Sequence, residues 1–324
     1  MITTVTLNTA VDCVAVLEAL DWGGVNRSAR CRMFPGGKGV NVAKAVAELG
    51  GEVVATGFVG AGPMGRFVVG GLRWFGFAHH PKALEGQRGA ACDFLELPGD
   101  TRLTFLLYDL SRGQETVVNN PGAYRVAPGD LEALRGKLSD LAARSSFVVF
   151  SGSLAEGCPS DTYADLIRLV TEAGGRAVLD TSEEALRQGL AGRPYLLKPT
   201  VRELRMIGAA PLHDEDDILR AAHQLQQRGI EVVVVSRGGE GVLARFGEQA
   251  YKVPALPAEV VSPIGAGDAL LGGLLVGLER GLVPPDALKL AVGAATSSLS
   301  RYGAALCRRP ESESLAETVV VQPL

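Results

Sequence analysis

Cysteine and histidine are both scarce in this chain of 324 residues. The five cysteines, at positions 13, 31, 92, 158 and 307, are an odd number and lack the paired spacing of a metal site. The four histidines include the pair His79-His80 but form no Cys/His cluster of the zinc type. We therefore expect reduced, mostly buried thiols in a cytoplasmic protein.

Long runs of basic or of apolar residues are also missing. The net charge is −4 with no long basic run, which argues against a nucleic-acid-binding surface. No apolar run reaches membrane-spanning length, and Met1 is followed directly by the strand-like segment Ile2–Leu7, so we expect no signal peptide. Apolar residues make up 47% of the chain, which is enough for a large core in one α/β domain.

Short β-branched segments alternate with segments of helical periodicity along most of the chain. The predicted strands are Ile2–Leu7, Val53–Phe58, Phe147–Phe150, Arg176–Leu179, Tyr195–Leu197 and Val232–Val235. The predicted helices are Val40–Leu49, Met64–Trp74, Pro128–Ala143, Ser160–Ala173, Asp214–Gln227 and Asp268–Arg280. This alternation predicts an α/β fold with a mostly parallel central sheet, helices on both faces, and ligands at the carboxyl ends of the strands.

Two segments interrupt the alternation, because they show period-two patterning with no helix between strands. Phe94–Leu97, Leu103–Tyr108 and Thr116–Asn119 are predicted to be antiparallel strands separated by turns. We predict a small β-sheet lid formed by 13–34 and 88–119, and an α/β core formed by 1–12, 35–87 and 120–324. A lid would exclude water from a bound ligand. An ordinary hairpin extension is the alternative.

The most informative motif is Gly265-Ala266-Gly267-Asp268, which an apolar, helix-like run follows at once. Small residues let the backbone approach an anion, and N–H groups at a helix start attract phosphate. A carboxylate there cannot bind phosphate, because like charges repel. Asp268 is therefore a candidate base that takes a proton from an attacking hydroxyl. A glycine-rich turn with an Asp placed by the helix dipole is the alternative for this tetrapeptide alone.

A second glycine motif occupies residues 35–45 and reads Pro-Gly-Gly-Lys-Gly-Val-Asn-Val-Ala-Lys-Ala. It has neither the spacing of a Walker A loop nor that of a dinucleotide fingerprint. Its glycines allow close backbone approach, Lys38 offers a point charge, and Asn41 offers an amide at the start of a helix. This set suits a polyhydroxy ligand that bears an anionic group.

Together these motifs make the chain similar to the ribokinase-like carbohydrate kinases, the phosphofructokinase B-type family. Within that family the chain most resembles the branch of 1-phosphofructokinase and tagatose-6-phosphate kinase. The similarity runs from Ile2 to about Cys307. The motifs that carry it are Leu7-Asn8-Thr9-Ala10-Val11-Asp12, Val25-Asn26-Arg27, residues 36–41, Gly99-Asp100-Thr101-Arg102, Ser151-Gly152-Ser153-Leu154, Asp180-Thr181-Ser182, Lys198-Pro199, Ser236-Arg237-Gly238-Gly239 and residues 265–268.

The resemblance implies roles for the residues at matching positions. Asp268 would be the catalytic base, and Gly265, Ala266 and Gly267 would form the anion hole. The residues implied for the sugar phosphate are Asp12, Gly37 and Asn41 at its hydroxyls, Lys38 and Arg102 at its phosphate, and Arg27 across a dimer. The residues implied for the nucleotide are Ser236, Gly238, Gly241, Ala295 and Ser298, and Glu203 is implied indirectly for the metal. Without the resemblance, Asp12 is a turn residue, Arg27 a solvated arginine, and Ala295 and Ser298 helix-packing residues.

The resemblance also implies an activity, ATP-dependent phosphoryl transfer with Mg²⁺ to a hydroxyl of a phosphorylated ketohexose. Fructose 1-phosphate is the first expected acceptor, followed by tagatose 6-phosphate or fructose 6-phosphate. The expected partners are ATP, the sugar phosphate and a second copy through the lid, without nucleic acid or membrane.

Three other functions fit the sequence less well than this one. A kinase of an unphosphorylated sugar or nucleoside is disfavoured by Lys38 and Arg102, because a neutral hydroxyl needs no cationic pair. A non-catalytic sugar-phosphate or nucleotide sensor is disfavoured by Asp268. A nicotinamide-dependent dehydrogenase is disfavoured because no dinucleotide fingerprint occurs near the start.

The chain departs from the family pattern at several positions. Thr200 stands where the Asn-x-x-Glu motif has Asn, beside the retained Glu203, which affects metal placement. Residues 263–264 read Pro-Ile instead of a Thr-containing pair, which leaves a monovalent-cation site open. Thr104 replaces a branch Asn near the expected sugar, and the segment 78–91 is longer than usual. The sugar phosphate, the oligomeric state and any allosteric regulation stay open from the sequence alone.

Overall fold

The computed structural model of the protein describes residues 1–75, 91–122, 124–208, 211–304 and 307–324. Its larger sheet has ten strands in the order β14-β13-β12-β11-β10-β9-β8-β1-β4-β5. The parallel part consists of β5 (Ala91–Leu97), β4 (Val53–Gly60), β1 (Ile2–Thr6), β8 (Phe147–Ser151), β9 (Ala177–Asp180), β10 (Leu196–Leu197) and β11 (Val232–Ser236). An antiparallel extension at one edge consists of β12 (Val242–Phe246), β13 (Gln249–Val253) and β14 (Gln322–Pro323). The predicted α/β class with a mostly parallel sheet is confirmed.

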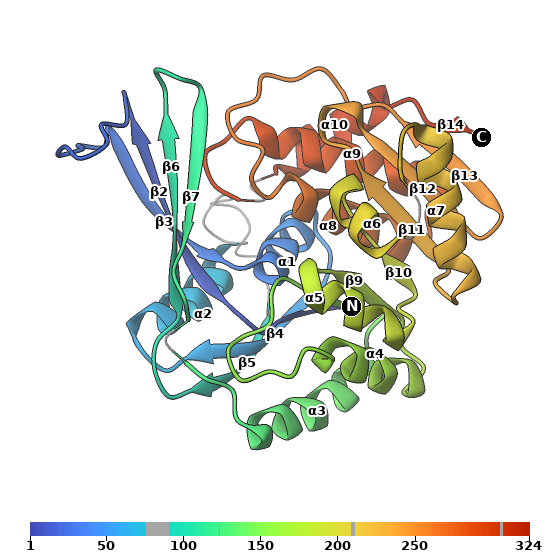
Figure 1. Ribbon diagram of the computed structural model, residues 1–324, viewed down its shortest axis with the longest axis horizontal. Coiled ribbons are helices and arrows are strands. Elements are labelled where there is room, and N and C mark those ends of the chain that lie inside the picture. The colour runs from blue at the N-terminus through green and yellow to red at the C-terminus, as the bar shows by residue number, and fades with distance from the viewer. Residues whose placement is uncertain (76–90, 123, 209–210, 305–306) are drawn as a thin grey trace.

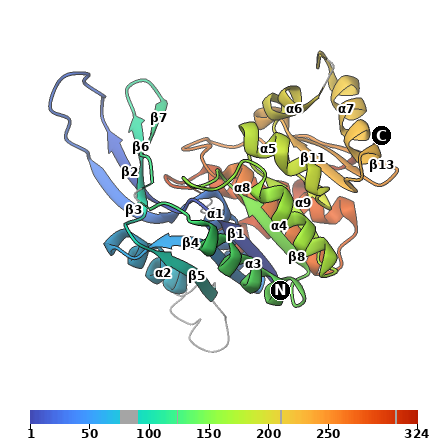
Figure 2. The same ribbon diagram turned by 60° about the horizontal axis from the view of Figure 1, so that its bottom comes forward.

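Helices cover both faces of this sheet (Figures 1 and 2). One layer consists of α1 (Lys38–Glu48), α2 (Pro63–Phe75), α8 (Ala266–Glu279), α9 (Pro284–Leu299) and α10 (Arg309–Thr318). The other consists of α3 (Pro128–Ala142), α4 (Thr162–Glu172), α5 (Glu183–Gly189), α6 (Val201–Ile207) and α7 (Glu215–Gln227). Within β11, Val232 and Val234 pack into the core on the α1 side, and Val233 and Val235 into the core on the α3 side. This alternation follows from the two-residue period of a strand.

A smaller four-stranded sheet stands out from the side of the α/β core (Figure 1). Its order is β3 (Arg30–Gly36), β2 (Ala10–Leu17), β6 (Arg102–Asp109) and β7 (Gln114–Asn119). β2 pairs antiparallel with β3 and parallel with β6, and β6 pairs antiparallel with β7. The second sheet is therefore confirmed, while its closure over a ligand stays a prediction.

The predicted composition of the small sheet needs two corrections. Phe94–Leu97 is not one of its strands, because β5 pairs parallel with β4 at the edge of the large sheet. The period-two pattern has a different cause: β5 alternates between exposed and half-buried residues along most of its length, as edge strands do when one face is covered. The small sheet also begins earlier than predicted, at Ala10, so Asp12 is one of its residues. Residues 76–90, where core and lid were predicted to meet, lie outside the described residues.

The carboxyl ends of β8, β9 and β10 lie side by side, because these strands are parallel neighbours in the large sheet. The residues at these ends come from positions near 151, 180 and 198. Within the described parts of the chain, no helix is long and apolar enough to cross a lipid bilayer.

Candidate active site

The Gly-Ala-Gly-Asp loop forms the start of α8, with Gly265 as its N-terminal cap. Gly265 has a φ of 77°, in the left-handed region that favours glycine. The N–H groups of Asp268 and Ala269 donate to the Gly265 carbonyl oxygen at 3.0 and 2.9 Å. The Ala266 N–H donates to the Pro263 carbonyl oxygen at 3.2 Å, so the Gly267 N–H is the one of this turn without a backbone acceptor among the described residues. Together with the helix dipole it makes this turn attractive to an anion.

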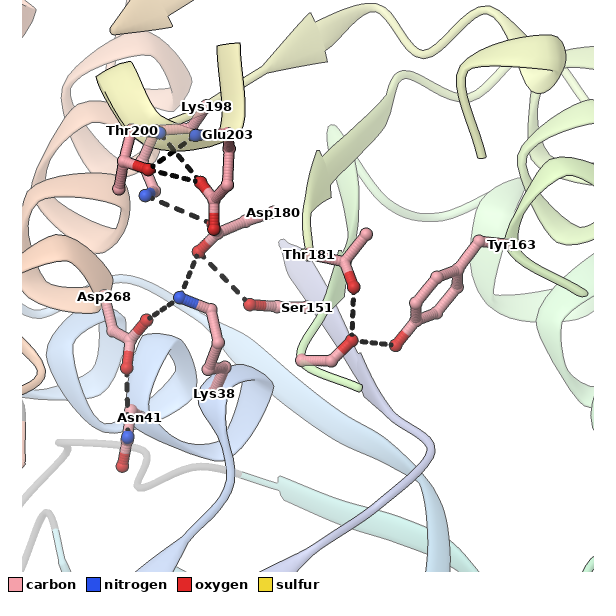
Figure 3. Close-up of polar contacts among 11 residues, drawn as sticks. Lys38, Asn41, Ser151, Tyr163, Asp180, Thr181, Lys198, Thr200, Glu203 and Asp268 are labelled. Atoms are coloured by element: carbon pink, nitrogen blue, oxygen red, sulfur yellow. Dashed lines mark hydrogen bonds and ion pairs between the residues drawn. The ribbon is translucent and has the colours of Figure 1, made fainter. Parts of the chain in front are cut away.

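Asp268 lies in this first turn and is buried, with 4% of its surface exposed. Its Oδ2 accepts a hydrogen bond from Asn41 Nδ2 at 3.0 Å, and its Oδ1 lies 3.1 Å from Lys38 Nζ (Figure 3). Asn41 and Lys38 both belong to the first turn of α1. The two glycine motifs that the sequence separates by more than 200 positions therefore meet at one carboxylate.

Lys38 lies between two carboxylates, those of Asp268 and Asp180. Its Nζ is 3.1 Å from Asp268 Oδ1 and 3.1 Å from Asp180 Oδ2. Burial lowers the pKa of Lys38, but Asp180 and Asp268 outweigh this and raise the pKa above its ordinary value. The side chain nevertheless keeps 42% of its surface exposed. Lys38 is therefore a firmly charged cation beside the candidate base, with one side accessible to a ligand.

Asp180, the last residue of β9, is the centre of a buried ion network at the strand ends. Its Oδ1 lies 3.1 Å from Lys198 Nζ, and its Oδ2 accepts from Ser151 Oγ at 3.4 Å. Burial raises the pKa of Asp180, but Lys198 and Lys38 more than offset this, and the pKa lies below its ordinary value. Asp180 and Lys198 are each only 2% exposed. Removing one partner of such a buried pair typically costs about 3–5 kcal/mol, so this network fixes the two lysines firmly in place.

Lys198 also lies close to the first turn of α8. A Cβ built on Gly267 would be 3.5 Å from Lys198 Nζ. The ammonium therefore adds positive charge at the turn whose N–H groups already favour an anion.

Asp12, which also interacts with Asp268, extends from β2 of the small sheet and is 6% exposed. A Cβ on Gly36 would overlap with the Asp12 carboxylate, which explains glycine at that position. Burial raises the pKa of Asp12, and the neighbouring Asp268 adds to this, while Lys44 and Arg102 act in the opposite direction. Gly37 has a φ of 100°, which also favours glycine, and caps α1. Asn41 thus contacts the candidate base, Asp12 interacts with it, and Gly37 caps the helix that carries Asn41.

Arg102, the first residue of β6, is held in place by three side chains. Its Nε donates to Asn8 Oδ1 at 3.1 Å, and its Nη1 donates to Thr104 Oγ1 at 3.1 Å and Asn119 Oδ1 at 3.2 Å. Asn8 Nδ2 in turn donates to Ser153 Oγ at 3.1 Å. Burial lowers the pKa of Arg102, which Asp12 partly offsets. Arg102 and Lys38 were predicted to share one phosphate, yet Arg102 lies among these neutral side chains and Lys38 among carboxylates.

Three residues predicted for the nucleotide site lie at the end of β11 and in the turn that follows it. Ser236 ends β11 and pairs with Thr200 through an isolated bridge, and its N–H donates to Pro199 O at 3.0 Å. Gly238 and Gly241, with φ of 59° and 89°, flank the short turn Gly238–Glu240. A Cβ on Gly241 would overlap with the Val253 carbonyl oxygen, so this position requires glycine.

Ser298, Glu203 and Arg27 were also predicted to belong to the site, and each lies in a different part of the structure. Ser298 is buried in α9 and donates to the carbonyl oxygen of Ala295 in its own helix, as a packing residue does. Glu203 Oε2 accepts from the N–H and the hydroxyl of Thr200, the cap of α6. Arg27 is exposed in the loop between β2 and β3.

Three residues of this site had no role assigned from the sequence, although their motifs were noted. They are Ser151, Asp180 and Lys198, which the strand order brings together. The sequence did contain a signal for these three residues, because each comes directly after a predicted parallel strand. Such positions meet at one edge of the sheet.

The chain matches the family described as pfkB family carbohydrate kinase over residues 4–311. It is similar to the 1-phosphofructokinase of Rhodobacter capsulatus, with 35% identity over 326 residues that cover all of this chain and 98% of that protein. Among solved structures, it is similar to phosphofructokinase-2 from Escherichia coli in complex with potassium. That pair has a TM-score of 0.87 and 25% identity over 98% of both chains. A possible 1-phosphofructokinase from Thermotoga maritima has a TM-score of 0.86 and 26% identity over 100% of this chain and 99% of that one.

Proposed function

The chain belongs to the pfkB family of carbohydrate kinases, and we propose that it phosphorylates a phosphorylated ketohexose with ATP, fructose 1-phosphate being its first acceptor. One observation carries this proposal. Asp268 is buried at the start of a helix, where Asn41 contacts one of its carboxylate oxygens and Lys38 the other, with Asp12 nearby and Lys198 beside the same turn. A base in this position has an acceptor hydroxyl on one side and phosphate oxygens on the other.

In the proposed mechanism, the sugar hydroxyls bind at Asp12 and Asn41. Asn41 Oδ1 is buried and has no hydrogen-bond partner among the described residues, so a sugar hydroxyl would satisfy it. Asp268 accepts the proton of the attacking hydroxyl as the new O–P bond forms and the bond to the β-phosphate oxygen breaks. The N–H groups of the first turn of α8 and the ammonium of Lys198 stabilise the charge on the transferred group.

Lys38 and Arg102 take separate roles in this proposal. Lys38 holds the Asp268 carboxylate in place through their ion pair and, from its exposed side, contacts the phosphoryl group during transfer. Arg102 binds the phosphate already on the sugar, with Asn8 and Ser153 beside it. A phosphate at Arg102 offsets the cost of burying the guanidinium, because charge-assisted hydrogen bonds replace those to water.

Mg²⁺ suits the nucleotide side of this site. It usually keeps several waters and binds one or two carboxylates together with nucleotide phosphates. The described residues contain no group of three or more His, Cys, Asp or Glu that could hold a metal. We assign Glu203, beside Ser236 through Thr200, as the carboxylate on that side. When bound with ATP, the ion would neutralise phosphate charge.

The outer face of the small sheet suits contact with a second copy of the chain. Its apolar residues include Met33 and Val118, which are 40% and 44% exposed, and Cys31, also exposed. The loop with Arg27 lies beside this face, so in a homodimer Arg27 could reach the partner's sugar phosphate. Sedimentation equilibrium should give the mass of two chains, and a single-chain mass at micromolar concentration would contradict the dimer.

We also place the reaction in the cytoplasm. All five cysteines are free thiols, as expected of a reducing compartment, but only Cys307 is buried and Cys31 is exposed, so the expectation of mostly buried thiols is wrong.

Product analysis with variants of Arg102 and Lys38 tests this function. With ATP and fructose 1-phosphate, the wild-type protein should form a bisphosphate that ³¹P NMR detects. Arg102→Ala should raise the KM for fructose 1-phosphate by about 10-fold or more and change the KM for ATP by less than about 2-fold, since one charge-assisted contact is lost. Lys38→Met should mainly lower kcat, because its ammonium lies beside Asp268.

Two results would contradict these assignments. Absence of a bisphosphate product from the wild-type protein would rule out the proposed reaction. Equal weakening of both substrates in Arg102→Ala would place Arg102 outside the sugar-phosphate site.

A further inference from the structure

Lys44 of α1 is a charged residue in the core next to the site. Its relative exposure is 0%, and its Nζ donates to the carbonyl oxygens of Pro35 at 3.0 Å and Ala304 at 2.9 Å. Burying an ammonium is costly unless the charge is compensated. None of the roles described above uses this residue, so the reason for its charge has to be found in its surroundings.

The backbone that Lys44 holds supports Asp12. Pro35 immediately precedes Gly36, whose backbone packs so closely on the Asp12 carboxylate that a Cβ would overlap with it. Lys44 also follows Asn41 by three positions on α1, so the two residues lie on one side of the helix. Asn41 contacts Asp268. Lys44 is thus connected to Asp12 through the Pro35 backbone and lies on the same side of α1 as Asn41, which contacts Asp268.

The charges around Lys44 come from several elements. Asp12 on β2 and Asp268 on α8 both act on the Lys44 ammonium, as does the Cys307 thiol. Arg102 on β6 also acts on Asp12. Lys38 also lies beside Asp268 and contacts Asp180 as well. Burial lowers the pKa of Lys44 to about 8, and the two carboxylates limit this decrease. In return, the ammonium counteracts the effect of burial on Asp12.

We propose that Lys44 is a positioning residue for phosphoryl transfer, which ties the Pro35 and Ala304 carbonyls together and so holds the Gly36 backbone against the Asp12 carboxylate. It touches neither substrate. An ionised Asp12 can accept hydrogen bonds from the sugar with both of its oxygens, and the nearby ammonium favours that ionised form. This inference rests on the proposed kinase function and adds a residue to it.

The pH dependence of kcat/KM for fructose 1-phosphate tests the inference in Lys44→Met, a neutral variant of similar length. The Lys44 ammonium lowers the pKa of Asp12, so loss of this positive charge should raise that pKa and move the acid limb to higher pH. The KM for ATP should change little. Lys44→Arg keeps the charge and should leave the acid limb at the wild-type position.

Leu134→Ala in α3 is the control for a purely structural effect, because Leu134 is fully buried in the other core. It should lower the melting temperature without moving the acid limb. An unmoved acid limb in Lys44→Met, with a lowered melting temperature like that of the control, would overturn the proposal and leave Lys44 a structural residue.

If Lys44→Met does not fold, the alkaline limb of the pH profile tests the proposal by comparing the wild-type protein with Lys44→Arg. Wild-type activity should then fall above about pH 8 as Lys44 loses its proton, whereas Lys44→Arg should retain activity. Identical alkaline limbs would overturn the proposal. An inactive wild-type protein would instead overturn the kinase function itself, so the two failures can be told apart.

Discussion

Replacing Asp268 by asparagine is expected to lower kcat by about 10²–10⁴-fold, the usual effect of removing a general base. The amide is nearly the same size as the carboxylate, so its oxygen can still face Lys38 and the α8 turn keeps its N–H groups. It cannot take a proton from the sugar hydroxyl. The KM values for ATP and for the sugar phosphate should therefore change much less than kcat.

Asp286→Asn is a matched control for this substitution. Asp286 occupies the third position of α9, as Asp268 does in α8, but it is exposed and pairs with Lys289. Both variants change the same charge in the same part of a helix, so any common effect on helix stability cancels. Near-normal turnover in a folded Asp268→Asn protein, measured beside Asp286→Asn, would refute the assignment of the base.

The sequence predicted much of the parallel sheet because its strands are short, apolar and separated by amphipathic helices. It failed at β5, where an exposed edge strand imitates the pattern of a small antiparallel sheet. It also did not anticipate β12 and β13, which extend the sheet antiparallel beyond β11. Pairing partners depend on tertiary contacts, and local periodicity does not contain them.

The site was predictable where one short motif contains both the backbone geometry and the chemical group. Gly265 and Asp268 are such a case, since the glycine conformation and the carboxylate lie within one helical turn. Asp180 and Lys198 are not, because their meeting depends on the order of β9 and β10. Lys38 was predicted as a cation, but which carboxylates it contacts depends on the fold.

A phosphorylated sugar should be preferred to its unphosphorylated parent by at least about 10²-fold in kcat/KM, because a site built for a charged group rejects its absence. The guanidinium of Arg102 is half-buried among neutral oxygens, and without a phosphate its desolvation is poorly compensated. The phosphate would also connect β6 of the small sheet to the core through Asn8 and Ser153. Its binding energy then supports the chemical step as well as affinity.

The most direct measurement is therefore kcat/KM from ATP consumption with Mg²⁺ over one panel of acceptors. The panel contains fructose 1-phosphate, tagatose 6-phosphate, fructose 6-phosphate, fructose, ribose and adenosine. Fructose 1-phosphate should give the highest value and should exceed fructose by at least about 10²-fold. If fructose, ribose or adenosine turns over as well as any sugar phosphate, both the role of Arg102 and the proposed acceptor are wrong.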